Sequence, residues 1–202
     1  MGDEQFAFTK QDNLKLKLYK LLLKKYAHLI NSAEKKTIGE IKSLVNPEDL
    51  TIQALLSEFK PDDFEFQRDF IPTAKKLFDF LISEITYVKA ELDINYWLTP
   101  KEIISNKLGD DEDLAVFLCS ILTALGDENA AVLICELDDL STHAAVFTEF
   151  KDKSYLLDPC QNHDFDAFSG DRKQILQAYH FNNAAIKRFI YQFNSKEYKQ
   201  FL

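Results

Sequence analysis

The sequence predicts an α+β fold, in which a helical N-terminal region precedes a core where one central helix packs on an antiparallel sheet. Two observations support this class. Apolar residues recur with helical spacing over most of the first 125 residues, and apolar or β-branched runs of strand length, separated by short turns, follow from residue 130. At 202 residues the chain is long enough for one core with a helical extension. We therefore expect a helical region over 1–92, packed on the core, and the core itself over 93–202.

The N-terminal region is expected to consist of helices joined by proline-containing breaks. The first carries leucines at helical spacing with lysines on its other faces. Pro47 is expected in the first turn of the third helix. The fourth is one long helix, or two helices divided near Pro72, because proline removes a backbone donor and clashes with the preceding turn. The expected helices span 12–31, 36–45, 48–59 and 64–91.

The second half begins with a short helix and then the central one. Thr99-Pro100-Lys101-Glu102 is a helix-start signature, with Thr99 as the cap, and Gly109 is the expected end of that helix. The central helix is expected over 112–125. Short turns near 138–142 and 152–153 favour an antiparallel meander. Strands are expected over 130–137, 143–150, 154–157 and 186–193, with helices over 172–181 and from a cap at Ser195.

Charge and cysteine content narrow the classes of partner. The formal charge is −9, but residues 1–46 hold nine lysines and five acids, a net of +4, and the remainder carries −13. An acidic body argues against nucleic acid as a partner, because phosphate binding needs a basic surface. The basic front end is either a solvated lysine face or a docking surface for an acidic partner or an anionic lipid surface. We expect a protein or peptide partner.

Several absences point to a cytoplasmic protein without a cofactor. Residues 1–13 are polar and lack the apolar segment of a signal peptide, and no apolar run reaches the roughly 20 residues that cross a bilayer. The three cysteines are odd in number and have no metal-ligand spacing. We therefore expect neither a cofactor nor a bound metal.

Four successive acids mark the start of the central helix. Asp110, Asp111, Glu112 and Asp113 follow Gly109, where free N–H groups and the positive end of the helix dipole favour negative charge. Capping alone explains such a run. A metal site built from these hard oxygen ligands with His143 is a further alternative.

One histidine and one aspartate follow the acid run at suggestive positions. If 143–150 and 154–157 are neighbouring strands, His143 and Asp158 lie at matching ends, and the carboxylate can orient the imidazole. His28, His163 and His180 have no such partner in the sequence. The order is that of a nucleophile, a base and an orienting acid, with an aspartate where the nucleophile is expected.

Taken together, these motifs resemble the transglutaminase-like superfamily over about residues 93–198. That superfamily shares a papain-like cysteine-protease core and a Gly-Asp-Cys-Glu-Asp pattern at the start of the central helix. The resemblance implies that His143 and Asp158 are triad positions and that Asp111 replaces the catalytic cysteine. The stretches that carry the resemblance are Tyr96-Trp97-Leu98-Thr99-Pro100-Lys101-Glu102, Gly109-Asp110-Asp111-Glu112-Asp113-Leu114-Ala115, Leu122-Thr123-Ala124-Leu125-Gly126, His143-Ala144, Tyr155-Leu156-Leu157-Asp158-Pro159 and Tyr191-Gln192-Phe193-Asn194.

Two functions follow from the resemblance. A catalytically inactive domain that binds proteins or serves as a scaffold is the preferred hypothesis, because a carboxylate is a far weaker nucleophile than a thiolate. The alternative is an active hydrolase or acyl transferase that uses Cys160, or Asp111 with His143 as an acid–base pair. Cys119 lies eight residues along the helix from Asp111, about 12 Å away, and is expected in the core with Cys135.

Overall fold

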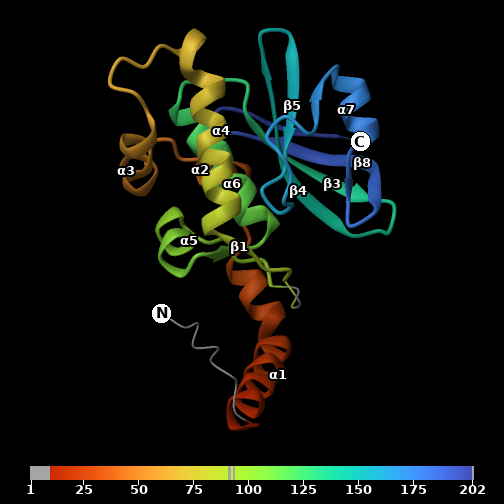
Figure 1. Ribbon diagram of the computed structural model, residues 1–202. Coiled ribbons are helices and arrows are strands. Elements are labelled where there is room, and N and C mark those ends of the chain that lie inside the picture. Colours follow the sequence, from red (N-terminus) through yellow and green to blue (C-terminus); the bar gives the residue numbers. More distant parts are fainter. Residues whose placement is uncertain (1–9, 91, 93, 202) are drawn as a thin grey trace. The chain divides into compact units, whose positions relative to one another are not determined.

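The structure is a computed structural model that describes residues 10–90, 92 and 94–201 (Figure 1). The prediction of no signal peptide rests on residues 1–13, most of which lie outside the described residues. The chain divides into two compact units, one with residues up to 35 and 90–96, the other with residues 36–89 and 97–202. The division at residue 92, made from the sequence, stays a prediction.

The smaller unit contains helix α1, Lys10–Ala33, which confirms the helix expected over 12–31. The backbone N–H of Asn95 donates to Asn31 Oδ1 at 2.8 Å, and this bond connects the 90–96 segment to the helix. Leu14, Leu18 and Leu21 are each more than half exposed. None of the described helices is long and apolar enough to cross a membrane.

The larger unit contains the remaining helices, and most of them begin at a side-chain cap. Thr37, Asp49, Thr99, Asp110 and Asp171 each accept a hydrogen bond from a backbone N–H of the first turn. Such caps satisfy donors that the helix itself leaves free. The helices are α2 Ile38–Leu44, α3 Leu50–Phe59, α4 Phe66–Glu84, α5 Pro100–Asn106, α6 Asp111–Ala124 and α7 Arg172–Ala178.

The main sheet has the strand order β6-β5-β4-β3-β8-β7, and β9 pairs with β8 on a branch of it. The pairs β3–β4 and β4–β5 are antiparallel, as the short turns predicted. A separate parallel pair joins β1, Thr86–Tyr87, to β2, Leu108–Gly109. The strands of the main sheet are β3 Ala131–Leu137, β4 Thr142–Phe150, β5 Lys153–Leu157, β6 Ser169–Gly170, β7 His180–Phe181, β8 Ala184–Phe193 and β9 Tyr198–Gln200.

Both faces of this sheet are apolar and covered by helices. Val132 and Ile134 of β3 pack with α3, α4 and α6, whereas Leu133 and Cys135 pack with α7 and β7 on the opposite face. This alternation follows from the two-residue period of a strand. In Figure 1, α4 and α6 lie on one side of the sheet and α7 on the other. The predicted α+β architecture, a central helix on an antiparallel sheet, is confirmed.

Two predictions about the helical region were wrong. Pro47 precedes the cap Asp49 instead of lying inside α3. Helix α4 runs through Pro72 as one long helix, the first of the two expected alternatives, but it ends at Glu84, seven residues earlier than expected. A mid-helix proline costs about 3 kcal/mol, and the buried apolar face of α4, which includes Phe70, Leu77 and Phe78, offsets that cost.

Two predicted chain segments also differ downstream. Helix α5 ends at Asn106, and its C-cap Lys107 lies in the left-handed region with φ 53°. Gly109 belongs to β2 and does not end the helix. No helix follows Ser195 within the described residues: the N–H groups of Lys196 and Glu197 donate to Asn194 Oδ1, which closes a turn, and β9 follows. Pairing with β8 satisfies more backbone groups than a short terminal helix can.

Candidate functional site

The start of α6 directs Asp111 out of the capping network. Asp110 and Asp113 form a reciprocal capping box, in which Asp110 Oδ1 accepts from the Asp113 N–H and Asp113 Oδ2 accepts from the Asp110 N–H. Asp113 Oδ1 also accepts from the Leu98 N–H at 2.7 Å, which fixes the segment that leads into α5. Because its neighbours provide the cap, Asp111 is left to interact with β4.

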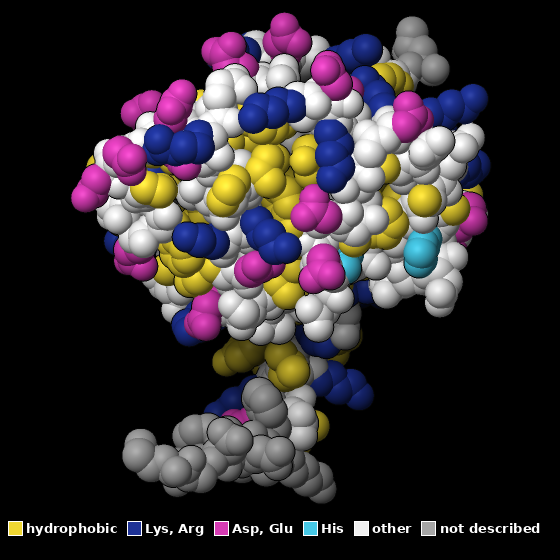
Figure 2. Space-filling model, turned by 45° about the horizontal axis from the view of Figure 1, so that its top comes forward, with side chains coloured by type: hydrophobic (Ala, Val, Ile, Leu, Met, Phe, Trp, Pro, Cys, Tyr) yellow, Lys and Arg dark blue, Asp and Glu magenta, His cyan; other side chains and the backbone are white. Residues whose placement is uncertain are grey.

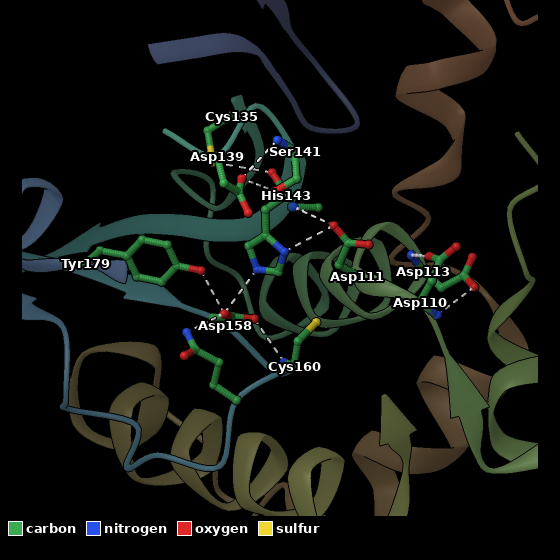
Figure 3. Close-up of polar contacts among 12 residues, drawn as sticks. Asp110, Asp111, Asp113, Cys135, Asp139, Ser141, His143, Asp158, Cys160 and Tyr179 are labelled. Atoms are coloured by element: carbon green, nitrogen blue, oxygen red, sulfur yellow. Dashed lines mark hydrogen bonds and ion pairs between the residues drawn. The ribbon is translucent and has the colours of Figure 1, made fainter. Parts of the chain in front are cut away.

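Strand β4 brings His143 between two carboxylates. The Nδ1 atom lies 3.2 Å from Asp111 Oδ2, and Nε2 lies 3.1 Å from Asp158 Oδ2 (Figure 3). Asp111 Oδ2 also accepts from the Ala144 N–H at 2.9 Å. The imidazole stacks on Phe181, with 3.8 Å between ring centroids and 15° between planes. The three positions singled out in the sequence therefore lie together.

Asp158 is held by donors that the sequence did not suggest. Its Oδ2 accepts from Tyr179 Oη at 2.7 Å and from Gln161 Nε2 at 2.8 Å, and its Oδ1 accepts from the Cys160 N–H at 2.9 Å. The Cys160 and Gln161 contacts are local, and the first is a turn of the kind that aspartate forms two residues on. Tyr179 and Phe181 come from α7 and β7, and neither follows a recognisable motif.

These contacts set the protonation of the site. Burial lowers the pKa of His143, but the hydrogen bonds to Asp111 and Asp158 outweigh it and raise the pKa to about 9. For Asp158, burial raises the pKa, whereas the bond from His143 and the other donors bring it below its usual value. At neutral pH His143 is therefore an imidazolium that lies between Asp111 and Asp158.

The remaining acids of the helix start are less easily ionised. Burial, with the neighbouring Asp111 charge, raises the pKa of Glu112 to about 8. Burial, with the neighbouring Asp110 charge, raises the pKa of Asp113 to about 7. The acid run therefore carries less negative charge than its composition suggests.

The three cysteines occupy different environments. Cys160 lies at the site: its Sγ, one ring nitrogen of His143 and one oxygen of Asp158 are all within 4.8 Å of one another. Burial, followed by the Asp158 and Asp111 charges, raises the pKa of the Cys160 thiol far above its usual value. Cys119 and Cys135 are buried in the core, as expected, and Cys135 Sγ donates to the His143 carbonyl.

Little of the site is open to solvent. The side chain of Asp111 is 21% exposed, that of His143 is 1% and that of Asp158 is 0%. His143 and Asp158 are therefore buried, and Asp111 is the most exposed of the three positions. His163, for which the sequence offered no partner, lies outside the site. It stacks on Phe78 and lines a separate cavity of about 630 Å³ that includes none of the three positions.

Comparison with known proteins agrees with this architecture. Residues 95–188 match the CEP76 peptidase-like domain family. No curated protein matches the chain. Two solved structures of Legionella pneumophila LapG are similar in fold, each at 15% sequence identity. The EGTA-treated protein has a TM-score of 0.52 over 89% of this chain and 86% of that chain. The other has a TM-score of 0.53 over 88% and 87%. These structures have a papain-like fold, so the fold expected from the transglutaminase-like resemblance is confirmed.

Proposed function

We propose that this papain-like domain is a catalytically inactive, transglutaminase-like module that binds a protein or peptide partner. The observation that carries the proposal is the contact between Asp111 and His143. A carboxylate occupies the helix N-terminus where the resemblance places a cysteine, and it pairs with the histidine Nδ1 at 3.2 Å.

Asp111 and His143 provide neither the nucleophile nor the base that acyl transfer needs. A carboxylate is too weak a nucleophile to attack an amide as a thiolate does. Both ring nitrogens of His143 face carboxylates, and its pKa of about 9 keeps both protonated at neutral pH. Such an imidazolium has no lone pair with which to accept a proton from water or a thiol.

The same contacts explain how the fold tolerates the aspartate. A thiolate–imidazolium pair at a helix N-terminus and a carboxylate–imidazolium pair have the same charges in the same places. Asp111 also accepts the Ala144 N–H, which would otherwise be a buried donor without a partner. The ion pair between Asp111 and His143 therefore explains how the site can stay ordered without catalysing a reaction.

Activity measurements on the full chain test the proposal. We expect no hydrolysis or transfer with peptide amide and glutamine-containing peptide substrates, and no labelling by electrophiles that target activated cysteines. Asp111→Cys serves as the positive comparison, because it restores a thiol at the helix start. Turnover by the unmodified chain above the rate of a His143→Gln variant would contradict inactivity.

The second candidate is an enzyme that uses Cys160, favoured by the position of its Sγ within 4.8 Å of the reactive atoms of His143 and Asp158. Burial of Cys160 and two nearby carboxylates raise the pKa of its thiol and oppose thiolate formation, which argues against this candidate. Cys160→Ala, with Cys119→Ala as the matched control in the core, separates the two candidates. Activity that is lost in the Cys160→Ala variant and kept in the Cys119→Ala variant would establish that the domain is an enzyme that uses Cys160.

The smaller unit is the proposed docking surface. Helix α1 combines exposed leucines with lysines on the basic part of the chain, a surface suited to an acidic amphipathic partner. On one face of the larger unit, by contrast, acidic and basic side chains are interspersed (Figure 2). The cysteines of the described chain are free, which fits a reducing, cytoplasmic setting. The proposed partner is a protein and not a nucleic acid.

Charge reversal on α1 tests the docking surface. We expect Lys17, Lys24 and Lys25 changed together to Glu to abolish capture of the partner found with the unmodified chain. The matched control reverses Lys75, Lys76 and Lys101, which are exposed on the larger unit. Equal capture by both variants would exclude α1 as the docking surface.

A further inference from the structure

Three side chains at the site offer the ligand types that zinc prefers. One ring nitrogen of His143, one oxygen of Asp158 and the sulfur of Cys160 lie within 4.8 Å of one another. Nitrogen, carboxylate oxygen and thiolate sulfur are the three donor types found in protein zinc sites. In Figure 3 the Cys160 sulfur points toward the His143 imidazole.

We propose that His143 Nε2, Asp158 and Cys160 Sγ bind one Zn²⁺ ion. This ligand set differs from the run of acids considered from the sequence, because it uses Asp158 and Cys160 in place of the acids that begin α6. A soft sulfur donor with an imidazole selects zinc over calcium and magnesium. Binding at these residues does not depend on catalytic activity or on a partner.

The geometry needs only small adjustments. Zinc–ligand distances of about 2.0–2.3 Å place tetrahedral ligand atoms about 3.3–3.7 Å apart. The Nε2–Oδ2 distance is 3.1 Å, and one ring nitrogen of His143, one oxygen of Asp158 and the sulfur of Cys160 lie within 4.8 Å of one another. On zinc binding the ion replaces the hydrogen bond between Nε2 and Oδ2, the Cys160 side chain moves closer to these two groups, and solvent provides the fourth ligand.

Asp111 has a defined part in this arrangement. A histidine that binds zinc usually donates its other ring N–H to a carboxylate, which fixes the tautomer and the ring orientation. Asp111 Oδ2, 3.2 Å from Nδ1, is placed for that contact. Tyr179, Gln161 and the Cys160 N–H hold the Asp158 carboxylate in the same way.

The local charge also favours a cation. Within the described part of the chain, the ion pairs of Asp111 and Asp158 involve His143 alone and no lysine or arginine. On binding, the ion takes the place of the proton on His143 Nε2 and of the thiol proton of Cys160. Both protons pass to solvent, and the imidazole stays neutral with its proton on Nδ1.

Titration of the chelator-treated full chain with Zn²⁺, followed by calorimetry, tests the proposal. We expect one ion per chain, and we expect Co²⁺ in its place to give tetrahedral d–d bands with a sulfur-to-cobalt charge-transfer band. Cys160→Ala removes that band, whereas Cys119→Ala, a matched change in the core, keeps it. Asp111→Asn weakens affinity about 10–100-fold, as loss of such a carboxylate does elsewhere.

A second readout avoids variants altogether. In the unmodified chain, Zn²⁺ is expected to slow alkylation of Cys160 and to leave the slow alkylation of Cys119 unchanged, as measured by peptide mass spectrometry. Absence of binding, a cobalt spectrum without a thiolate band, affinity unchanged in a folded Cys160→Ala variant, or no protection of Cys160 would each overturn the proposal.

Discussion

Raising the pH of the metal-free protein should remove a sizeable part of its stability by deprotonating His143. The folded pKa is about 9, against an ordinary value of 6.5, because two carboxylates accept from the ring. A folded pKa above the unfolded one means that the stabilisation is fully present below pH 6.5 and is lost as pH rises through 9. The difference of about 2.5 corresponds to about 3 kcal/mol of unfolding free energy.

Asp111→Asn tests the origin of this effect. The amide oxygen still accepts a hydrogen bond but carries no charge, so the His143 pKa should fall toward 6.5 and the pH-dependent loss should shrink to about 1–2 kcal/mol. Urea denaturation in the presence of a chelator, at intervals from pH 6 to pH 10, measures the loss. Asp138→Asn, which removes an exposed carboxylate, is the control.

Titration of the ring by NMR isolates His143 from the acids nearby. Glu112 and Asp113 also have raised folded pKa values, about 8 and about 7, so their contribution likewise falls as pH rises through those values. Only the imidazole signals report His143 itself. A ring that titrates at or below pH 6.5 in the unmodified chain would refute the ion-pair account of the site.

Three further outcomes follow from the same contacts. Asp111→Cys should produce a thiol that reacts with iodoacetamide at pH 6–7 faster than an unperturbed cysteine. The reason is that a helix N-terminus and a charged histidine lower thiol pKa values to about 3.5–7.5. Alkylation rates measured by mass spectrometry check this. Tyr179→Phe should cost about 1.5–3 kcal/mol in urea denaturation through its charge-assisted bond to Asp158, against no measurable change for exposed Tyr96→Phe. Asp110→Ala should cost about 0.5–2 kcal/mol as a lost helix cap, and an unchanged midpoint would contradict the capping role.

The parts of the fold that sequence predicted are those governed by local rules. The capping box of Thr99 and Glu102 and the apolar strand at 131–137 depend on neighbouring residues and formed as expected. Pro72 did not break its helix, because burial of a face formed by distant elements overrides a local cost. The end of the chain paired with β8 for the same reason, since only the folded sheet supplies the partner.

Some residues of the site could also be predicted from the sequence, whereas others are identified only by the tertiary structure. Asp111, His143 and Asp158 were found from their order along the chain and from the expected strand pairing. Tyr179 and Phe181 hold two of these residues, but their positions depend on how α7 and β7 cover the sheet. No spacing rule connects residue 179 to residue 158, so only the tertiary structure identifies this support.

An aspartate at position 111 satisfies more of the site than the smaller residues that would also remove a nucleophile. Alanine would leave two buried donors, the Ala144 N–H and His143 Nδ1, without an acceptor, at about 1–3 kcal/mol each. Serine would offer one oxygen but no charge to balance the imidazolium. A carboxylate accepts both bonds, pairs with the charged ring when no metal is bound, and fixes the Nδ1 tautomer when one is. Position 111 therefore has a structural role whether or not the site is catalytically active.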